Sequence, residues 1–549
     1  MALKEYNKAL LLQPNNSSYL NNKANVLREM GQLNGATKFY KLALQFNPTS
    51  VRYWCNLAKV CNENNKFQNA EKAAKNALKI DRGSIEALNN LGLALENQNK
   101  PQQALEIYKN ALEASPENAI INCNIGKLYF VINEIQQATK FIKKSISLNP
   151  NLVEPYYNLC EIYDKTNQID QFAKTLSLVP NTLNKDPSIQ LKKGQLKFRT
   201  KQYIECIDLL DGIDVQKLPI TKRSILHELL GKSLDYMQNF DKAFFNFTRM
   251  NEINFDMAYN FEIQAEPYKK NIVNLIHNFT EQTYSPKNNS EPKEKGSPTF
   301  IIGFPRSGTT LLDTVLRSHP DIEVIEEKPL IDTVISSLNE PVSPNTLTKL
   351  SQTQLIKLRN LYEEESKKLV KQIQNGQIII DKFPLNIIHV PLINALFPES
   401  KFILVIRHPC DCVLSCFMQN FELNEAMVNF LRIKDTVELY CNVMKLWSIY
   451  SEQLILNVEI VKYENLVSNF EETSKKILNF LSLEWDDNLL KFYETGRARN
   501  KIMTPSYHQV TEKIYTYATD RWKNYSKNLK TDINPLKPWL NYFSYHEKN

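Results

Sequence analysis

Residues 299–317 read TFIIGFPRSGTTLLDTVLR, and this stretch decides the fold of the second half of the chain. Thr299–Ile302 is a short run of β-branched and aromatic residues, which favours a strand. Gly303–Thr310 is a loop bounded by glycines, and Leu311–Arg317 carries apolar residues at helical spacing. A strand, a Gly-bounded loop and a helix in this order aim backbone N–H groups and a helix N-terminus at an anion. The stretch therefore predicts an anion-binding loop.

Strand and helix patterns alternate after this loop. Gln377–Ile380, Phe402–Ile406 and Glu459–Lys462 are further candidate strands, and Leu385–Leu396 and Glu438–Glu452 are candidate helices. Such alternation predicts a parallel α/β sheet that binds its ligands at the carboxyl ends of the strands.

The loop differs from the nucleotide-triphosphate loop G-x4-G-K-[ST] at one position, because Thr309 stands where that motif has Lys. That Lys neutralises the β- and γ-phosphates of ATP or GTP. Its absence argues against triphosphate hydrolysis and kinase-like phosphoryl transfer. Arg306 supplies a positive charge inside the loop instead. Taken alone, the loop could still be an ordinary β–turn–α junction.

The first half of the chain repeats with a period of 34 residues. Pro14, Pro48, Pro116 and Pro150 fall on this grid, and Arg82 occupies the one vacant point. Small residues recur on the same grid in three columns, Ala9, Ala43, Ala77, Ala111 and Ser145, then Ala36, Ala70, Ala104 and Ala138, then Ala24, Ala58, Gly92 and Gly126. Small residues let helices approach closely, and Pro ends a helix. The pattern predicts an array of helix–turn–helix units.

The array has an incomplete start and a looser end. Residues 1–16 are interpreted as the second helix of a repeat whose first helix is missing, and less regular units follow at Val153–Leu178, Pro187–Leu218 and Thr221–Asn254. We expect three parts: a repeat array over residues 1–254, a helical connector with the polar run Tyr284–Ser297 over 255–297, and an α/β domain over 298–549.

Composition limits the class of protein. Of 549 residues, 42% are hydrophobic and 23% are charged, as in an ordinary globular protein. The 13 glycines predict a chain that is rich in helix and short of tight turns. The net charge of +7 is a mild bias toward anionic ligands and too weak to indicate nucleic acid. No apolar run approaches the ~20 residues of a membrane-spanning helix, and the N-terminus shows no signal peptide.

The nine Cys are scattered, which favours reduced thiols and predicts a cytoplasmic location. The alternative is the Golgi, if an anchor precedes the half repeat at Met1. Cys410-x-Cys412-x3-Cys416 lacks the paired C-x2-C spacing of zinc sites, so no metal is predicted.

The 34-residue units resemble tetratricopeptide repeats. Pro305–Thr310 resembles the 5′-phosphosulfate loop of sulfotransferases that use 3′-phosphoadenylyl sulfate (PAPS), especially those fused to tetratricopeptide arrays and the tyrosylprotein sulfotransferases. The resemblance implies an N-terminal all-α tetratricopeptide superhelix followed by a P-loop-like α/β sulfotransferase domain with a parallel sheet.

The resemblance implies four catalytic residues. Glu327 lies eight residues after His319, where the tyrosylprotein enzymes place the general base on the acceptor hydroxyl, and Glu326 is its rival. A phenol is a weak nucleophile at neutral pH, so a carboxylate that takes its proton accelerates attack. Lys382, at the end of a predicted strand, matches the catalytic Lys that neutralises charge on the leaving oxygen, and Arg306 shares this work. Ser506 matches a Ser that assists at the sulfuryl site.

The resemblance also implies a donor site. It comprises the loop residues Arg306, Ser307, Gly308, Thr309 and Thr310, the 3′-phosphate ligands Arg407 and Ser415, the nucleotide contact Tyr463, and Arg521 before Trp522. Arg offers a bidentate fork to phosphate, and Ser adds a hydroxyl donor. Two positions depart from the tyrosylprotein enzymes, which have Arg where this chain has Gln419 and Pro329. The first departure predicts a phosphate site that is either weaker or completed by Arg521, and the second puts acceptor recognition in doubt.

The expected reaction is sulfuryl transfer from PAPS to an acceptor hydroxyl without a metal, and a protein tyrosine is the favoured acceptor. The array would then dock a protein or peptide substrate in its groove. Three alternatives stay open: a catalytically degenerate tetratricopeptide scaffold, a sulfotransferase for a non-protein hydroxyl, and an array that serves only packing or dimerisation.

Overall fold

The predicted parallel sheet lies in the second half of the chain. In the computed structural model, five strands pair in the order β2-β3-β1-β4-β5, and all four pairings are parallel. The strands are β1 (Thr299–Gly303), β2 (Ile322–Glu326), β3 (Ile378–Lys382), β4 (Lys401–Ile406) and β5 (Asn457–Lys462). The chain passes from β1 to β2 and β3 on one side and then crosses to β4 and β5 on the other. This switch places the carboxyl ends of β1 and β4 at one crevice, where open α/β sheets bind ligands.

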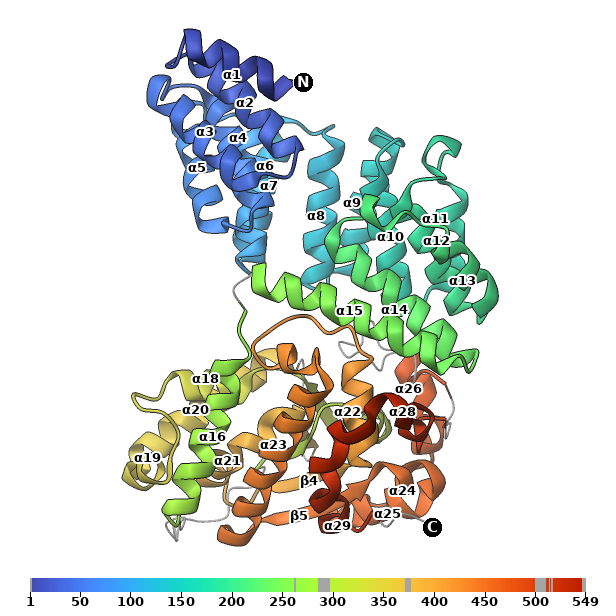
Figure 1. The fold of residues 1–549 in the computed structure, drawn as a ribbon. Helices are drawn as coiled ribbons and strands as arrows, with labels where there is room; N and C mark the ends of the chain where they lie inside the picture. The colour runs from blue at the N-terminus through green and yellow to red at the C-terminus, as the bar shows by residue number, and fades with distance from the viewer. Residues whose placement is uncertain are drawn as a thin grey trace. The chain divides into compact units, whose positions relative to one another are not determined.

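The structure describes residues 2–260, 263–284, 297–370, 377–498, 510–512, 514 and 517–545. The chain divides into two compact units, drawn in Figure 1. Unit 1 comprises Met1–Lys201 and Asp211–Lys217, and unit 2 comprises Gln202–Leu210 and Leu218–Asn549. Most of the predicted linker Tyr284–Ser297 lies outside the described residues.

Unit 1 consists of paired helices, which confirms the predicted all-helical array. Its helices are α1 (Ala2–Leu12), α2 (Ser17–Glu29), α3 (Leu33–Phe46), α4 (Val51–Glu63), α5 (Phe67–Ile80), α6 (Ile85–Asn97), α7 (Pro101–Ala114), α8 (Ala119–Val131), α9 (Ile135–Leu148), α10 (Val153–Lys165), α11 (Ile169–Ser177) and α12 (Pro187–Arg199), with 3₁₀ turns at Asn181–Leu183 and Val215–Lys217. α13 (Tyr203–Asp211) falls mainly in unit 2. Each grid proline lies between the second helix of one repeat and the first helix of the next.

The small residues of the grid lie where two helices touch. Ala36, Ala70, Ala104 and Ala138 are fully buried. A Cβ added to Gly92 would lie 2.4 Å from the Tyr108 ring, and one added to Gly126 would lie 2.5 Å from Cγ1 of Ile142. Backbone and side chain are therefore in direct contact at these two positions, which explains why the column changes from Ala to Gly there.

Turns inside the repeats use a left-handed residue every 34 positions. Gly31, Asn65, Asn99, Asn133, Asn167 and Lys201 have φ between 55° and 74°. Asn tolerates this region better than most side chains because its short amide can bond locally. The array thus makes tight turns with few glycines, and the expectation of few tight turns is wrong. Asn16, Ser50, Ser84 and Asn118 recur in the same way and cap the first helix of each repeat.

Unit 2 has helices on both faces of the sheet. They are α14 (Ile220–Tyr236), α15 (Phe240–Asn260), α16 (Glu266–Glu281), α17 (Thr309–Leu316), α18 (Leu330–Ser336), α19 (Pro344–Lys349), α20 (Gln352–Leu369), α21 (Val390–Leu396), α22 (Pro409–Phe417), α23 (Ile433–Gln453), α24 (Tyr463–Ser468), α25 (Phe470–Leu481), α26 (Phe492–Ala498), α28 (Ser526–Leu529) and α29 (Lys537–Tyr542). Among the described residues of unit 2, 3₁₀ turns lie at Pro384–His389, Met427–Phe430, Asp487–Lys491, Arg521–Tyr525 and Lys530–Leu536.

Side chains that point alternately to the two faces of the sheet belong to two hydrophobic cores, one on each face. Phe300 and Leu404 belong to the core that includes α21 and α23, whereas Ile301, Ile403 and Val405 belong to the core that includes α17 and α25. Successive side chains of a strand point to opposite faces, so nearly continuous apolar strands fill both layers.

Two elements differ from the sequence prediction. β2 was not predicted, although it forms an edge of the sheet. The predicted helix Leu385–Leu396 is instead a 3₁₀ turn followed by α21, with Pro391 in the first turn of α21. Pro has no N–H to continue a helix that starts upstream, so the segment divides there. The last predicted repeat forms α14 and α15, which belong to unit 2.

Candidate active site

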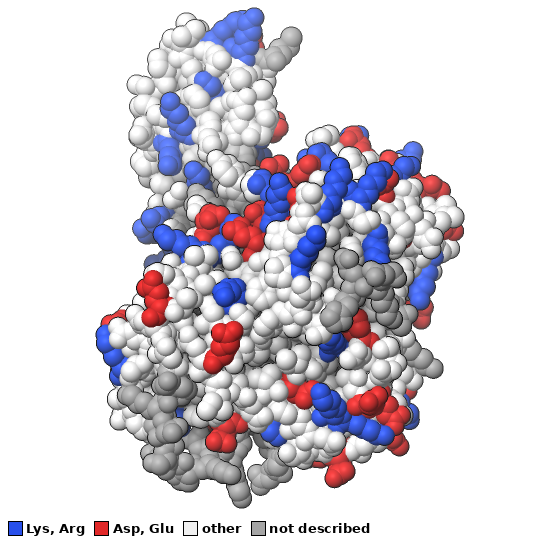
Figure 2. All heavy atoms as spheres, turned by 60° about the horizontal axis from the view of Figure 1, so that its bottom comes forward, with Lys and Arg blue, Asp and Glu red and all other residues white. Residues whose placement is uncertain are grey.

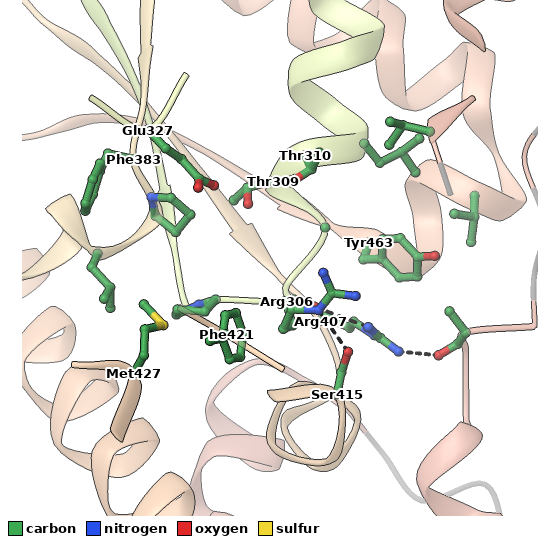
Figure 3. Close-up of a pocket in the computed structure, with 18 of the residues that line it drawn as sticks. Arg306, Thr309, Thr310, Glu327, Phe383, Arg407, Ser415, Phe421, Met427 and Tyr463 are labelled. Carbon is green, nitrogen blue, oxygen red and sulfur yellow. Dashed lines mark hydrogen bonds between the residues drawn. The ribbon is translucent and has the colours of Figure 1, made fainter. Parts of the chain in front are cut away.

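The loop between β1 and α17, residues Gly303–Gly308, is named the anion loop here. Arg306 has φ 68° and Gly308 has φ 106°, both in the left-handed region. A Cβ on Gly308 would lie 2.5 Å from the Tyr463 ring, and one on Gly303 would lie 2.4 Å from the carbonyl oxygen of Val405. Glycine is therefore required for the close approach of this loop to β4 and α24. Thr309 and Thr310 begin α17 at the crevice (Figure 3).

Ser307 of the loop and the adjacent Arg407 are buried, and each carries one polar side-chain atom that has no hydrogen-bond partner within the described residues. Ser307 is 1% exposed and Arg407 is 7% exposed. Ser307 Oγ and Arg407 Nε have no hydrogen-bond partner within the described part of the chain. Buried polar atoms are nearly always satisfied, so an unsatisfied donor pair at a Gly-bounded loop fits a site for an anionic group.

Arg306 and Arg407 meet at the crevice between β1 and β4. Arg306 Nε donates to Ser415 Oγ on α22 at 3.1 Å, and Arg407 Nη1 donates to the carbonyl oxygen of Arg306 at 3.2 Å. Arg407 Nη2 donates to the carbonyl oxygen of Ala518, and its guanidinium lies 5.0 Å from the centre of the Tyr463 ring. The structure thus brings together the four predicted donor-site residues Arg306, Arg407, Ser415 and Tyr463 (Figure 3).

A second charged group lies at the ends of β2 and β3. Lys382 is fully buried, and its Nζ lies 2.7 Å from Glu327 Oε1 and 3.4 Å from Glu326 Oε1. Asp313 of α17 is 3.9 Å from the same Nζ and is also buried. Burial acts to lower the pKa of Lys382, but Glu327, Glu326 and Asp313 outweigh it and raise the pKa above its usual value. Lys382 is therefore a firmly charged ammonium.

Glu326 and Glu327 both reach Lys382, but by different routes. Glu326 ends β2 as the direct cross-strand neighbour of Lys382, and its Oε1 lies 3.4 Å from Lys382 Nζ. Glu327 adopts φ 47°, and its N–H donates to the carbonyl oxygen of Lys382 at 2.8 Å. Its side chain is 31% exposed and lines the cavity, whereas that of Glu326 is 8% exposed. Of the two, Glu327 has the access that an acceptor needs.

The crevice is a cavity of about 390 Å³ with an apolar part on each side of the anion loop. On the Glu327 side lie Phe383, Phe421 and Met427, named the Phe383 arm (Figure 3). On the other side Tyr463 packs with Leu311, Val467, Ile514 and Ala518, named the Tyr463 arm. The cavity therefore has two apolar parts with the cationic residues Arg306 and Arg407 between them.

Two predicted site residues, Ser506 and Arg521, and the neighbouring Trp522 need separate comment. Ser506 lies outside the described residues. Arg521 lines the cavity, but its guanidinium also forms an ion pair with Asp235 of α14 at 2.7 Å. Trp522 is stacked on His408 with ring centres 5.2 Å apart, and its backbone N–H donates to Asp411 at 2.9 Å.

Gln419 and Pro329, the two departures from the tyrosylprotein enzymes, are not among the described residues that line the cavity. Gln419 is 8% exposed, and its Nε2 donates to Glu228 of α14 at 3.3 Å. Pro329 is exposed and precedes α18.

Sequence reasoning missed three buried carboxylates around this cavity: Asp313, Asp411 and Asp235. Asp313 interrupts the apolar run of α17, which was a readable signal. Asp411 accepts the backbone N–H groups of Asp520 and Trp522, both at 2.9 Å, and Asp235 binds a residue 286 positions away. These two depend on contacts between distant segments, which no local pattern records.

Family models match both halves of the chain. Residues 298–487 match the model described as the sulfotransferase family. Residues 5–38, 51–84, 85–118 and 119–152 match models of the tetratricopeptide repeat. The chain carries a sulfotransferase-family domain that follows a tetratricopeptide array.

The relatives that this chain matches are distant. An uncharacterized protein of Aquifex aeolicus is 28% identical over 334 residues, which cover 57% of this chain and 41% of the relative. Protein-tyrosine sulfotransferase 2 of Gallus gallus is 25% identical over 236 residues, which cover 41% of this chain and 62% of the relative. The chain thus spans less than two thirds of either relative. Among solved structures, the sulfotransferase domain of the Synechococcus PCC 7002 olefin synthase aligns at 20% identity with a TM-score of 0.32, covering 44% of this chain and 91% of that domain.

The cysteines near the sulfotransferase-family site are buried. Cys412 Sγ donates to the carbonyl oxygen of Arg407, and Cys416 Sγ donates to that of Pro305. Burial raises the pKa of both thiols, so they stay protonated. Over the described ranges, no cluster of three or more His, Cys, Asp or Glu residues is arranged to hold a metal ion.

Two further observations concern helices and surface charge. Among the helices of the described residues, none has the length and apolar character to span a bilayer. Basic and acidic side chains are interspersed on the face drawn in Figure 2. Among the described residues, the basic side chains that line the cavity, and so face an anionic ligand there, are Arg306, Arg407 and Arg521.

Proposed function

We propose that the sulfotransferase-family domain binds PAPS and transfers its sulfuryl group to an acceptor hydroxyl. The observation that carries this proposal is one cavity lined by the anion loop, Arg306, Arg407 and the carboxylate Glu327, with the buried Lys382 paired to Glu327 behind the cavity wall. Charged groups are arranged there for both an anionic donor and a proton-bearing acceptor.

The donor site follows from the charges at the crevice. Arg306, Ser307 and the backbone N–H groups at the start of α17 would hold the 5′-phosphosulfate. Arg407 and Ser415 would hold the 3′-phosphate, because a buried Arg with an unsatisfied Nε favours a fixed, doubly charged oxyanion. The Tyr463 arm would take the adenine. Gly308, Thr309 and Thr310 place the loop backbone against the phosphate.

The chemistry is an in-line displacement at sulfur. A bond forms between the acceptor oxygen and sulfur, the bond from sulfur to the 5′-phosphate oxygen breaks, and the acceptor proton passes to Glu327. Lys382 contacts Glu327 Oε1, so Oε2 is the oxygen that accepts this proton. The ammonium of Lys382 and the guanidinium of Arg306 stabilise the negative charge on the departing phosphate. The products are a sulfate ester and adenosine 3′,5′-bisphosphate.

A phenolic acceptor fits the Phe383 arm best. Phe383, Phe421 and Met427 form an apolar wall beside Glu327, which suits a flat aromatic ring whose hydroxyl reaches the carboxylate. The relative from Gallus gallus is named for protein tyrosine. We therefore take a tyrosine side chain as the acceptor.

The tetratricopeptide array of unit 1 would dock the protein that carries this tyrosine. Such arrays present an extended surface for protein partners. Cross-linking during turnover, read by mass spectrometry, tests this assignment. We expect cross-links from the acceptor protein to residues 17–199, and cross-links confined to unit 2 would contradict it.

Donor recognition is tested by thermal shift with adenosine 3′,5′-bisphosphate against ADP. A ligand at 100 times its Kd stabilises the folded state by ~2.7 kcal/mol, which is a visible shift in Tm. We expect the bisphosphate to shift Tm at concentrations where ADP does not. Equal shifts would remove the 3′-phosphate assignment.

Catalysis is tested by transfer of ³⁵S from labelled PAPS to a tyrosine peptide. Glu327→Gln removes the proton acceptor and should lower kcat by ~10²–10⁴-fold while the Kd of adenosine 3′,5′-bisphosphate stays unchanged. Lys382→Ala should also lower kcat. The matched variant Glu326→Gln keeps the shape and neighbourhood of the site and should cost far less. A larger loss with Glu326→Gln than with Glu327→Gln would reverse their roles.

The acceptor is tested with a panel that holds the donor constant. A tyrosine peptide, the same peptide with Tyr replaced by Phe or by Ser, and a small phenol separate the alternatives. We expect label on the tyrosine peptide and none on the Phe and Ser peptides. Labelling of the small phenol alone would favour a non-protein acceptor, and no label on any of them would favour a scaffold.

A further inference from the structure

A carboxylate of α14 lies behind the cavity wall. Asp235 is 1% exposed, and Arg521 approaches it with two nitrogens, Nη2 at 2.7 Å from Oδ2 and Nε at 3.3 Å from Oδ1. The hydroxyl of Tyr517 donates to Oδ2 at 2.7 Å, and that of Tyr525 donates to Oδ1. One buried side chain therefore binds three residues of a single segment.

That segment, residues 517–525, is named the closing segment because it forms part of the cavity wall. Ala518 and Arg521 both line the cavity. The carbonyl oxygen of Ala518 accepts a hydrogen bond from Arg407 Nη2. The carboxylate of Asp411 accepts hydrogen bonds from the backbone N–H groups of Asp520 and Trp522. The position of the closing segment thus helps to set the orientation of Arg407 as well as Arg521.

The helix that carries Asp235 is fixed to the rest of unit 2. The helix α15 packs against α14 and forms two hydrogen bonds to the end of α22 and the segment after it. Asn251 Nδ2 donates to the carbonyl oxygen of Phe417 at 2.7 Å, and Asn254 Nδ2 donates to Asn420 Oδ1 at 2.9 Å. The rings of Phe244 and Phe417 stack with centres 5.2 Å apart. The backbone of Asp235 is therefore held by the packing of the α14–α15 hairpin in unit 2, and its carboxylate is held by the closing segment.

The contact between Asp235 and Arg521 fixes the orientation of the Arg521 guanidinium. The bonds to Asp235 use the Nε–Nη2 edge of Arg521, and a two-point carboxylate contact of this kind fixes the guanidinium plane. Burial and the neighbouring carboxylate raise the pKa of Tyr517 and Tyr525, so both remain hydroxyl donors to Asp235 at neutral pH. Arg521 Nη1 is not engaged by Asp235.

We propose that Asp235 is a positioning residue for the donor nucleotide: it orients Arg521 and the closing segment so that the cavity binds the 3′-phosphate. This inference rests on the proposed function. A helix whose sequence pattern is that of a repeat thereby sets the affinity of the sulfotransferase-family site for its donor.

The test compares full-length Asp235→Asn with wild type and with Asp241→Asn. Asp241 lies in the first turn of α15 and is exposed, so its variant is the matched control. Titration calorimetry gives the Kd of adenosine 3′,5′-bisphosphate and of adenosine 5′-monophosphate, which lacks the 3′-phosphate. We expect Asp235→Asn to raise the Kd of the bisphosphate at least tenfold and that of the monophosphate less than threefold. The KM for PAPS should rise while kcat stays within threefold.

Each other outcome overturns the inference. An equal loss for both nucleotides would show a general structural role, and unchanged binding would show no role. Tighter binding of the bisphosphate would show that Asp235 competes with the phosphate for Arg521. If Asp235→Asn does not fold, Tyr517→Phe is used instead, because it removes one hydrogen-bond donor to Asp235. It should raise the Kd of the bisphosphate and leave the Kd of the monophosphate unchanged. Failure of wild type to bind the bisphosphate would remove the proposed function itself, whereas unchanged binding by the variant removes only this inference.

Discussion

Asp381 shows how one residue of the sheet couples stability to pH. It lies in β3 next to Lys382, is fully buried, and accepts a hydrogen bond from the Tyr362 hydroxyl at 3.0 Å. Burial raises the pKa of Asp381 to about 7, although the bond from Tyr362 and the charge of Lys382 act in the opposite direction. The folded state therefore takes up a proton that the unfolded chain, with a pKa of ~3.9, releases.

Asp381→Asn should flatten the dependence of stability on pH. Because the pKa is raised on folding, the stabilising effect of the proton is complete below pH ~4 and is lost as the pH rises through 7, at up to ~1.4 kcal/mol per unit. The variant should lose this slope and exceed wild type in free energy of unfolding at pH 8. Urea titrations at pH 5 to 8, followed by Trp fluorescence, measure it, since four of the five Trp lie in unit 2.

The exposed residue Asp256 supplies the control for this measurement. Asp256→Asn should keep the slope of wild type. A wild-type slope that persists in Asp381→Asn would place the titrating group elsewhere.

Two glycines in helices of unit 1 make a matched test at the scale of an element. A Cβ on Gly126 in α8 would lie 2.5 Å from Ile142 Cγ1 and 3.0 Å from the carbonyl oxygen of Ala138, whereas a Cβ on Gly35 in α3 meets only Leu27 Cδ1 at 3.6 Å. Gly126→Ala should destabilise by ~1–3 kcal/mol through overpacking. Gly35→Ala should stabilise by ~0.4–1 kcal/mol, because Ala favours a helix and restricts the unfolded chain.

Thermal unfolding followed by circular dichroism at 222 nm compares the two variants. Equal shifts in Tm would mean that the close contact between α8 and α9 does not require glycine at position 126.

Elements with a strong local pattern could be predicted from the sequence, and those defined by distant partners could not. β1 and β4 are apolar runs between turn signals, and the helix pairs follow from a grid of small residues. β2 reads IEVIE, so its acidic residues hid a strand that is a sheet edge. The Asn column at Asn65, Asn99 and Asn133 was visible in the sequence, but its left-handed turns were not inferred.

The same distinction applies to the site. The anion loop, Lys382 and Arg407 follow strands directly, so motif order located them. The pairing of Arg521 with Asp235 joins residues 286 positions apart, and only the folded chain brings them together.

At the scale of the whole molecule, we expect ligand binding to stabilise one of the two compact units and not the other. All described residues that line the cavity belong to unit 2, and so do α14 and α15, whose pattern is that of a repeat. A ligand that binds only the folded form of one unit stabilises that unit by mass action. The boundary that matters for donor binding therefore precedes α14 rather than β1.

Hydrogen exchange with adenosine 3′,5′-bisphosphate tests this boundary. At 100 times Kd, the stabilisation of ~2.7 kcal/mol should slow by ~100-fold those amides that exchange through global opening of unit 2. We expect this slowing in the sheet and in α14 around Asp235, with no change in α2 to α9. ADP at the same concentration is the control and should slow exchange far less. Equal slowing across unit 1 would mean that both units open together, and no slowing in α14 would separate this helix from the ligand-binding unit.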